Sequence, residues 1–579
     1  MRKFGKYIKS LCTILGGIVI VCGLSALAVC LYNRNKSYIE PHSMIMIDMN
    51  HNYSEVPTDG LLDEILDRKS MSFQKLIKAI EFAAFDDRID GIVARIEISN
   101  LELAQIQDVA RAVMNYKKSG KPAYVFSQGF GPLGQGNREY YLATFFDKIY
   151  MQPRTTIGIT GINIEVPFFK KLLNKVGVDA EFYTRYQYKT AMASFTDDKM
   201  SAPFREEMQN LSQNLMNEIK TDIVKNRDLK QDIDVLINKA PLSAEEGINE
   251  GLVDELLYLP QLEEKLKEDG VESFVSVEDY AEQIYPNTGD LPTIAYLNIN
   301  GVINTGETSS DIDGGYVLGS QSVLADLAEI EEIENLKAII VRVDSPGGSY
   351  NAADEIYFAL KNIKKNKNIP VIISQSGYAA SGGYFISLAG DYIVTEPATI
   401  TGSIGVLGGK FVMQKLWEKL DINWDGVKIG NNAGILSPNN VFSESEKNNF
   451  NKSLDEVYKD FTAKVVENRK LSKDIDEIAR GRVWTGRQAL ELGLVDALGG
   501  INEALAEACK RGGIDTNSKI RIVSYPREKS FSEKLRDLIL KGNVNINKYI
   551  TASGVDIRYL KLFKRWQYDT VLVPFNINM

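Results

Sequence analysis

The stretch SQSGYAASGGYFISLAGDYIV, residues 374 to 394, joins the end of an apolar run to the start of a predicted helix. Small residues crowd around Ser381 at this junction, in the order Gly-Tyr-Ala-Ala-Ser-Gly-Gly. Such residues let two backbones pack closely. They also leave room for a substrate beside a serine that stands at a helix N-terminus. Ser381 is therefore either part of a tight packing contact or a candidate nucleophile.

The surroundings of this stretch occur twice in the chain. DKIYMQPRTTIGITGINIEV at 147–166 matches DYIVTEPATITGSIGVLGGK at 391–410, which lies 244 positions later. APLSAEEGINEGLVDEL at 240–256 matches RVWTGRQALELGLVDAL at 482–498, 242 positions later. Upstream, GIVARIEIS at 91–99 matches AIIVRVDSP at 338–346. Three blocks in the same order at nearly one offset predict an internal duplication.

Each copy alternates predicted strands and helices. AIIVRV and PVIIS are short β-branched runs, and NAADEIYFALKNIKKN between them places Ile356, Ala359, Leu360 and Ile363 on one helical face. This alternation predicts βαβ units, a mostly parallel sheet and an α/β fold.

The same features divide the chain into four predicted parts. The turn-forming cluster YPNTGDLP at 285–292 predicts the boundary between the copies. The parts are a basic tip and anchor (1–35), a first repeat (36–290), a second repeat (291–525) and a C-terminal extension (526–579).

The N-terminus predicts a membrane anchor. MRKFGKYIKS carries four basic residues and no acid, and 21 uncharged residues follow, from Leu11 to Leu31. That length spans a bilayer as a helix and exceeds the apolar part of a usual signal peptide. The basic flank places the N-terminus in the cytoplasm and the rest of the chain outside. Cleavage after ALA at 26–28, or lipid attachment at Cys30, is the alternative.

Composition excludes several classes of function. Of the 579 residues, 44% are apolar and 25% are charged, as in globular proteins, and the net charge of −10 argues against a nucleic-acid partner. Only Cys509 lies beyond the apolar segment, so an intrachain disulfide is not expected there. The chain has two histidines, His42 and His51, both close behind the anchor. A Ser-His-Asp triad or a histidine metal site deeper in the chain is therefore not expected.

The two copies have lost complementary residues. The position equivalent to Ser381 in the first copy is Asn137, and the loop DSPGGS at 344–349 corresponds to EISNLE at 97–102, which lacks both glycines. Conversely, Lys189 of the first copy corresponds to Ala433 in the second. This pattern predicts one composite site whose serine comes from one copy and whose lysine comes from the other.

A serine and a lysine can together perform acyl transfer. A serine hydroxyl needs a base, and lysine acts as one only when it is neutral. With an ordinary pKa, roughly one lysine in a thousand is neutral near pH 7.4, but burial in an apolar pocket lowers the pKa. YQYKTAMASF supplies apolar neighbours around Lys189, and Gly347 and Gly348 can present backbone N–H groups to an oxyanion.

The motifs DSPGGS, GYAASGGYFIS, TGSIGV and GLVDALGG resemble those of the signal peptide peptidase A family in its long tandem-repeat form, over about residues 45 to 525. The resemblance implies tandem crotonase-like domains related to the Clp protease. It also implies a homotetramer at the outer (periplasmic) face of the cytoplasmic membrane that degrades signal-peptide remnants as extended strands, without a metal or other cofactor.

The resemblance also assigns residues. It makes Ser381 the nucleophile, Lys189 the base, Ser403 of TGSIG the group that orients the lysine amine, and Gly347 and Gly348 the oxyanion donors. Gln187, two residues before Lys189, stands where the family usually has another lysine. Two alternatives to a peptidase stay open at this point: an acyl-CoA enzyme of crotonase type and a non-catalytic membrane scaffold.

Overall fold

The computed structural model describes residues 39–57, 71–131, 134–284, 291–310, 316–515 and 518–527. The predicted anchor, most of the predicted boundary at 285–292 and nearly all of the C-terminal extension lie outside these residues. Within the described ranges, none of the helices combines the length and the apolar character that crossing a membrane requires.

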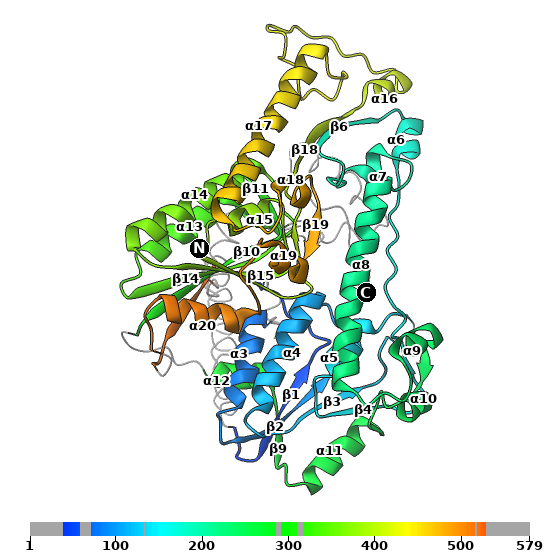
Figure 1. Ribbon diagram of the computed structural model, residues 1–579, viewed down its shortest axis with the longest axis vertical. Helices are drawn as coiled ribbons and strands as arrows, with labels where there is room; N and C mark the ends of the chain where they lie inside the picture. Colours follow the sequence, from blue (N-terminus) through cyan, green and yellow to red (C-terminus); the bar gives the residue numbers. More distant parts are fainter. Residues whose placement is uncertain are drawn as a thin grey trace, which may run out of the picture.

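The first repeat forms a six-stranded parallel sheet with the order β8-β4-β3-β2-β1-β9 (Figure 1). In chain order its strands are β1 (Ser43–Asp48), β2 (Ile89–Arg95), β3 (Ala123–Ser127), β4 (Lys148–Met151), β8 (Glu255–Leu256) and β9 (Ser273–Ser276). The helices of this half are α3 (Phe73–Ala83), α4 (Leu103–Lys117), α5 (Asn137–Ala143), α6 (Lys170–Val176), α7 (Ala193–Thr196), α8 (Ala202–Asn226), α9 (Ile233–Lys239), α10 (Ala244–Asn249), α11 (Leu259–Glu268) and α12 (Val277–Gln283).

The second repeat forms an eight-stranded sheet in which β20, β16, β15, β14, β10 and β21 follow the same order as the strands of the first. These strands are β10 (Thr293–Asn300), β14 (Leu336–Ser345), β15 (Val371–Ala380), β16 (Tyr392–Thr395), β20 (Ala497–Leu498) and β21 (Arg521–Tyr525), joined by β17 (Ile400–Gly402) and β19 (Val483–Thr485). Its helices are α13 (Ser320–Glu331), α14 (Tyr350–Lys367), α15 (Gly382–Ser387), α16 (Gln414–Lys419), α17 (Glu444–Asn468), α18 (Ile475–Ile478), α19 (Gly486–Leu492) and α20 (Ile501–Arg511). The shared strand order shows that the fold is duplicated.

The central strands of the second sheet are buried on both faces. In β10, Ile294 and Tyr296 belong to the core that the sheet shares with the first repeat. Ala295 and Leu297, which point the other way, belong to the core under α13 and α14. Burial on both faces explains why these strands read as continuous apolar runs in the sequence. The predicted helix at 351–366 is α14, and its predicted apolar face is buried except for Ala359, which is half-buried.

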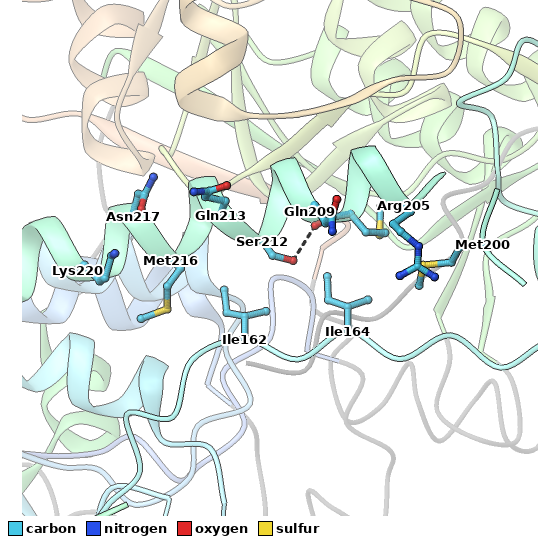
Figure 2. Close-up of a pocket in the computed structure, with 11 residues that line it drawn as sticks. Ile162, Ile164, Met200, Arg205, Gln209, Ser212, Gln213, Met216, Asn217 and Lys220 are labelled. Atoms are coloured by element: carbon cyan, nitrogen blue, oxygen red, sulfur yellow. Dashed lines mark hydrogen bonds between the residues drawn. The ribbon is translucent and has the colours of Figure 1, made fainter. Parts of the chain in front are cut away.

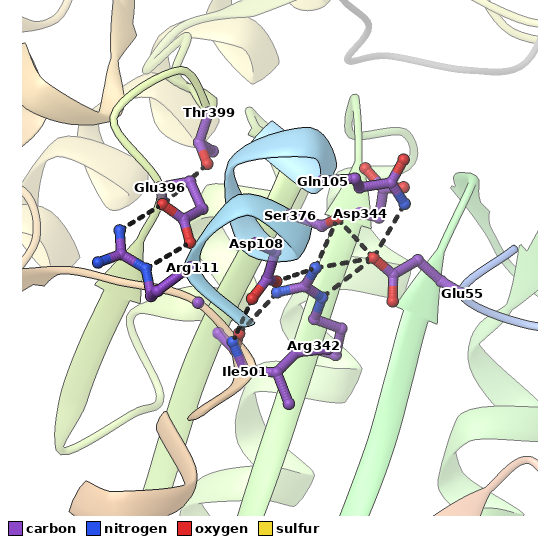
Figure 3. A network of polar contacts seen from close by, with 12 residues as sticks. Glu55, Gln105, Asp108, Arg111, Arg342, Asp344, Ser376, Glu396, Thr399 and Ile501 are labelled. Carbon is purple, nitrogen blue, oxygen red and sulfur yellow. Dashed lines mark hydrogen bonds and ion pairs between the residues drawn. The ribbon is translucent and has the colours of Figure 1, made fainter. Parts of the chain in front are cut away.

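A buried ion cluster joins the two repeats (Figure 3). Arg342 on β14 of the second repeat lies 2.9 Å from Glu55 and 3.0 Å from Asp108, both of the first repeat. A second pair, Arg111 of α4 with Glu396, crosses the same interface at 2.8 Å. The Arg342 guanidinium is 1% exposed, so its charge is balanced by these carboxylates rather than by water. The cluster fixes the relative position of the two sheets.

The two repeats are also joined by a pair of strands that lies far from the two main sheets. β6 (Asp179–Arg185) of the first repeat pairs antiparallel with β18 (Val406–Val412) of the second, beside α17 (Figure 1). Because Lys189 follows β6 directly, this pairing carries a segment of the first repeat onto the second.

Smaller pairings complete the topology. β5 (Thr156–Ile157) pairs with β7 (Leu242–Ser243), and β13 (Tyr316–Gly319) pairs with β11 (Val302–Asn304) and β12 (Ser309–Ser310).

Candidate active site between the repeats

Ser381 stands at a sharp turn between β15 and α15. The last three residues of β15 pair with β17, and the Ser381 N–H donates to the Gly402 carbonyl at 2.8 Å. Ser381 has a φ of 57°, which is strained for a residue with a side chain. Strained residues of this kind are concentrated at functional sites. The turn ends the strand and aims the Ser381 side chain at the interface between the repeats.

The small residues around Ser381 are needed for space. A Cβ atom on Gly347, whose φ is 108°, would lie 2.8 Å from the Ser381 Cβ and 2.9 Å from the Gly382 nitrogen. The glycine loop therefore packs against the serine with no room for a side chain. The structure confirms the packing interpretation of the small residues, and the same close packing places the loop beside the Ser381 hydroxyl.

Lys189 reaches Ser381 from the other repeat. Its Nζ donates to the Ser381 Oγ at 2.8 Å, to the Ser403 Oγ at 3.0 Å and to the Ser403 carbonyl at 3.1 Å. Ser403 itself has a φ of 51° and is held by the Arg482 carbonyl, which accepts its N–H. The structure thus brings together the three side chains predicted to interact, Ser381, Lys189 and Ser403, within one chain. Their catalytic roles stay predictions.

The backbone around Lys189 is packed against the second repeat. Gly481 has a φ of 90°, and a Cβ there would lie 2.6 Å from the Lys189 Cα. Tyr188 and Met192 on either side are buried, as the apolar sequence around the lysine predicts. Lys189 itself is 3% exposed. Its amine is therefore cut off from bulk water.

Burial controls the protonation of this lysine. Loss of hydration lowers the pKa of Lys189 to about 7, and the nearby Glu207 carboxylate acts in the opposite direction. Burial likewise raises the pKa of Glu207 to about 8, although the Val483 N–H donates to this carboxylate at 2.8 Å. With these values a large share of Lys189 is neutral at neutral pH and can accept the Ser381 proton.

Glu207 was not predicted from the sequence. It lies on α8 at the spacing of the buried residues Phe204, Met208 and Leu211. The sequence signal that could have identified Glu207 is an acidic residue on the apolar face of a predicted helix.

The N–H groups of the two predicted oxyanion donors, Gly347 and Gly348, have different surroundings. The Gly347 N–H already donates to the Ser345 Oγ at 3.1 Å. Gly348 remains available, since the neighbouring contacts with Ile303 use the Gly347 carbonyl and the Ser349 N–H instead. A further donor is Gly382, whose N–H is the first of α15 and has no acceptor within its helix. The N–H groups of Gly348 and Gly382 are therefore without a backbone acceptor beside Ser381, whereas that of Gly347 is used within its own loop.

The position in the first repeat that is equivalent to Ser381 carries no nucleophilic side chain. Asn137 begins α5, and its side chain exchanges hydrogen bonds with the Gly161 backbone at 2.8 and 3.1 Å. The two histidines lie elsewhere: His42 contacts Asp90, and His51 contacts Glu278. Neither imidazole takes part in the Lys189 contacts.

Comparison with known proteins shows the family to which the chain belongs. The model of peptidase family S49 matches residues 115–272 and again 363–515, and the Clp protease model matches residues 318–398. The chain is 31% identical to Protease 4 of Haemophilus influenzae over 468 residues, covering 77% of this chain and 74% of that one. It is 31% identical to Protease 4 of Salmonella typhi, covering 75% and 71%. It is 29% identical to the chloroplastic serine protease SPPA of Arabidopsis thaliana, covering 79% and 68%.

The fold and the matches define a serine protease with a duplicated α/β fold of the Clp protease type. The chain belongs to peptidase family S49, in the long form with two tandem domains. The acyl-CoA enzyme and the non-catalytic scaffold that the sequence left open are therefore set aside.

Proposed function

We propose that this chain is a membrane-anchored endopeptidase that degrades cleaved signal peptides with a serine–lysine dyad. Ser381 is the nucleophile, Lys189 the general base and Ser403 the residue that orients the lysine amine. The observation that carries the proposal is the 2.8 Å hydrogen bond from Lys189 Nζ to Ser381 Oγ across the two repeats.

The first half of the reaction forms an acyl-enzyme. The neutral Lys189 amine takes the Ser381 proton as the Oγ attacks a peptide carbonyl. Backbone N–H groups of the glycine loop and of Gly382 stabilise the oxyanion. The Lys189 ammonium then gives its proton to the leaving amine, which departs as the new N-terminus of one product.

The second half of the reaction releases the acyl group. The neutral Lys189 takes a proton from a water molecule, and the resulting hydroxide attacks the ester carbonyl. When the tetrahedral intermediate collapses, Lys189 returns the proton to the Ser381 Oγ. No metal or other cofactor is required by these steps.

The setting of the reaction follows from the sequence. The apolar segment 11–31 would hold the chain in the cytoplasmic membrane, with the catalytic part on the outer side. Signal-peptide remnants are extended, apolar and left in that membrane, so an anchored peptidase meets them at high local concentration. The assembly proposed with this function is a homotetramer.

The test is hydrolysis of a fluorogenic signal-peptide substrate by the full chain in detergent. Lys189→Ala should lower kcat by about 10²–10⁴-fold, the usual contribution of general-base catalysis. Ser381→Ala removes the nucleophile itself and should lower kcat by about 10⁶-fold. Asn137→Ala is the matched control, because it alters the equivalent position of the first repeat, and it should retain activity if it folds.

Circular dichroism and the oligomer mass are compared for all variants, so that loss of fold is not read as loss of chemistry. Retention of most activity by Lys189→Ala would show that the base is wrongly assigned. Hydrolysis of general peptides but not of signal peptides would support the dyad and contradict the proposed substrate class.

A further inference from the structure

Four residues of the second repeat contact both pieces of backbone that carry Lys189 and Ser403. We call these residues, 480–483, the bridging segment. The carbonyl of its first residue accepts the N–H of Tyr188, the residue directly before Lys189, at 3.3 Å. The carbonyl of Arg482 accepts the Ser403 N–H at 2.7 Å. A shift of the bridging segment would therefore change the distance between the Lys189 amine and the Ser403 hydroxyl.

The bridging segment also supports the nucleophile. It leads into β19, where Val483 lies opposite Gly402 of the neighbouring strand β17. The Gly402 carbonyl accepts the Ser381 N–H at 2.8 Å. The positions of Ser381, Lys189 and Ser403 thus all depend on one short piece of backbone.

Glu207 of the first repeat holds this piece of backbone in place. Its carboxyl group accepts the Val483 N–H at 2.8 Å, and the residue is 4% exposed. A buried backbone N–H needs an acceptor, and here a side chain of α8 provides it. The contact therefore ties a helix of one repeat to the strand that supports the site in the other.

An acid is unusual at this position of α8. The polar residues Arg205, Gln209 and Ser212 face a groove on one side of the helix (Figure 2). With about 3.6 residues per turn, Glu207 lies on the opposite side, near the buried Leu211. Burial of a carboxyl group is costly unless the group is paired or accepts hydrogen bonds. The acid at this position therefore needs a specific reason.

The other copy shows that the fold itself does not require the acid. α17 is the counterpart of α8, 242 positions later, and it has the exposed Asn449 at the position of Glu207. The counterpart of Val483 is Pro241, which has no N–H to donate. Donor and acceptor are thus both missing from the equivalent pair. They occur together only where the two elements support Lys189 and Ser381.

The neighbouring Glu206 adds a contact at the surface. It accepts the Tyr188 hydroxyl at 3.2 Å and pairs with Arg482 at 3.2 Å. The Glu206 side chain is 57% exposed, and an exposed ion pair contributes little to stability. The buried hydrogen bond of Glu207 is therefore the contact expected to fix the bridging segment.

Glutamine is a close substitute for Glu207 in this environment. Burial raises the pKa of Glu207 to about 8, although the Val483 N–H and the charges of Arg482 and Lys189 act in the opposite direction. The acid is therefore largely neutral at pH 7. A neutral carboxyl group accepts an N–H through its carbonyl oxygen, as a glutamine amide does. Leucine has a similar size but no acceptor, so the two variants together isolate the hydrogen bond.

We propose that Glu207 is a positioning residue of the dyad: through Val483 it fixes the bridging segment, and the bridging segment fixes Lys189 and Ser403 relative to Ser381. The inference rests on the proposed function, because it takes Ser381 and Lys189 as the reacting groups. Glu207 itself does not touch the reacting atoms.

The first test is hydrolysis of a fluorogenic signal-peptide substrate at pH 7 by the full chain in detergent. Glu207→Leu should lower kcat by about 10- to 100-fold with KM within about threefold of wild type, since a misplacement of about 1 Å costs that much. Glu207→Gln should keep kcat within about threefold of wild type, because the acceptor remains. Asn449→Leu makes a similar change at the equivalent, exposed position of α17 and should have the kcat of wild type.

Three results would overturn the proposal. The first is a kcat of Glu207→Leu within twofold of wild type. The second is an equal loss in the leucine and glutamine variants, because the acceptor would then not be the cause. The third is a loss confined to KM, which would place Glu207 in substrate binding instead.

The second test is independent of activity. Hydrogen–deuterium exchange is followed by mass spectrometry in a peptic fragment that covers residues 480–485. The Val483 N–H should exchange at least about 10-fold faster in Glu207→Leu, whereas Glu207→Gln should exchange like wild type. If Lys189→Ala retained activity, the proposed function would fail, but this measurement would still decide whether Glu207 holds the bridging segment. Unchanged exchange in Glu207→Leu would contradict the positioning role.

Discussion

The protonation of Lys189 gives the sharpest quantitative prediction. Its pKa falls from 10.5 to about 7 because the amine is buried, which corresponds to about 5 kcal/mol in favour of the neutral form. At pH 7.4 this raises the neutral fraction from roughly one in a thousand to about two thirds. Burial therefore supplies nearly a thousandfold more of the catalytically competent base.

The pH dependence of acylation follows directly. The logarithm of kcat/KM should rise with unit slope below about pH 7 and level off above it, a change of about 100-fold between pH 5 and the plateau. Lys189→Arg keeps a long cationic side chain but stays charged at every accessible pH. This variant should lose about 10²–10⁴-fold in kcat/KM at pH 8. Its kcat/KM should also no longer decrease as the pH falls below 7.

The assay is pre-steady-state acylation with a fluorogenic amide substrate, so that chemistry limits the measured rate. Folding must be followed in parallel. Between about pH 7 and 10 the unfolded chain binds a proton at Lys189 that the folded chain does not, so this group makes stability rise with pH over that window. A rate constant that is flat from pH 5 to 9, or an arginine variant within tenfold of wild type, would refute lysine as the base.

Three further outcomes are expected. Ser403→Ala removes one acceptor of the lysine amine and should lower kcat by about 2- to 12-fold, measured at saturating substrate with the fold unchanged. Gly347→Ala places a methyl group against the nucleophile and should cost about 10²-fold in kcat/KM, whereas Gly134→Ala, where nothing lies within 4 Å, should not. Arg342→Leu leaves two buried carboxylates without their cation and should cost about 3–5 kcal/mol in urea unfolding, against about 0–1 for the exposed pair tested by Lys230→Ala. An Arg342→Leu midpoint equal to that of wild type would contradict the assigned role of the ion cluster.

The strand order and the Lys189–Ser381 contact could be predicted from the sequence because the duplication allowed the two copies to be compared. The same strand order in both sheets was predictable from three matching blocks, because copies of one sequence fold alike. The proximity of Lys189 and Ser381 was predictable from what each copy had lost, although no local pattern connects residues 192 positions apart.

What the sequence did not predict depends on contacts between elements. Arg342 is visible as a charge within an apolar strand, but nothing near it in the sequence points to Glu55 as its partner. Glu207 needed the helix position to be known before its closeness to Lys189 had meaning. The availability of the Gly382 N–H, and the use of the Gly347 N–H by Ser345, are matters of backbone geometry that composition does not encode.

The division of the dyad between two repeats also orders events in time. During synthesis Lys189 emerges long before Ser381, and under the proposed mechanism the chain is inactive until the second repeat has folded and β18 has paired with β6. A peptidase built this way cannot cut its neighbours while it is still being synthesised. Cleavage of the chain between the repeats should inactivate both fragments unless they reassociate. Pairing of β6 with β18 thus makes activity depend on the presence of both repeats.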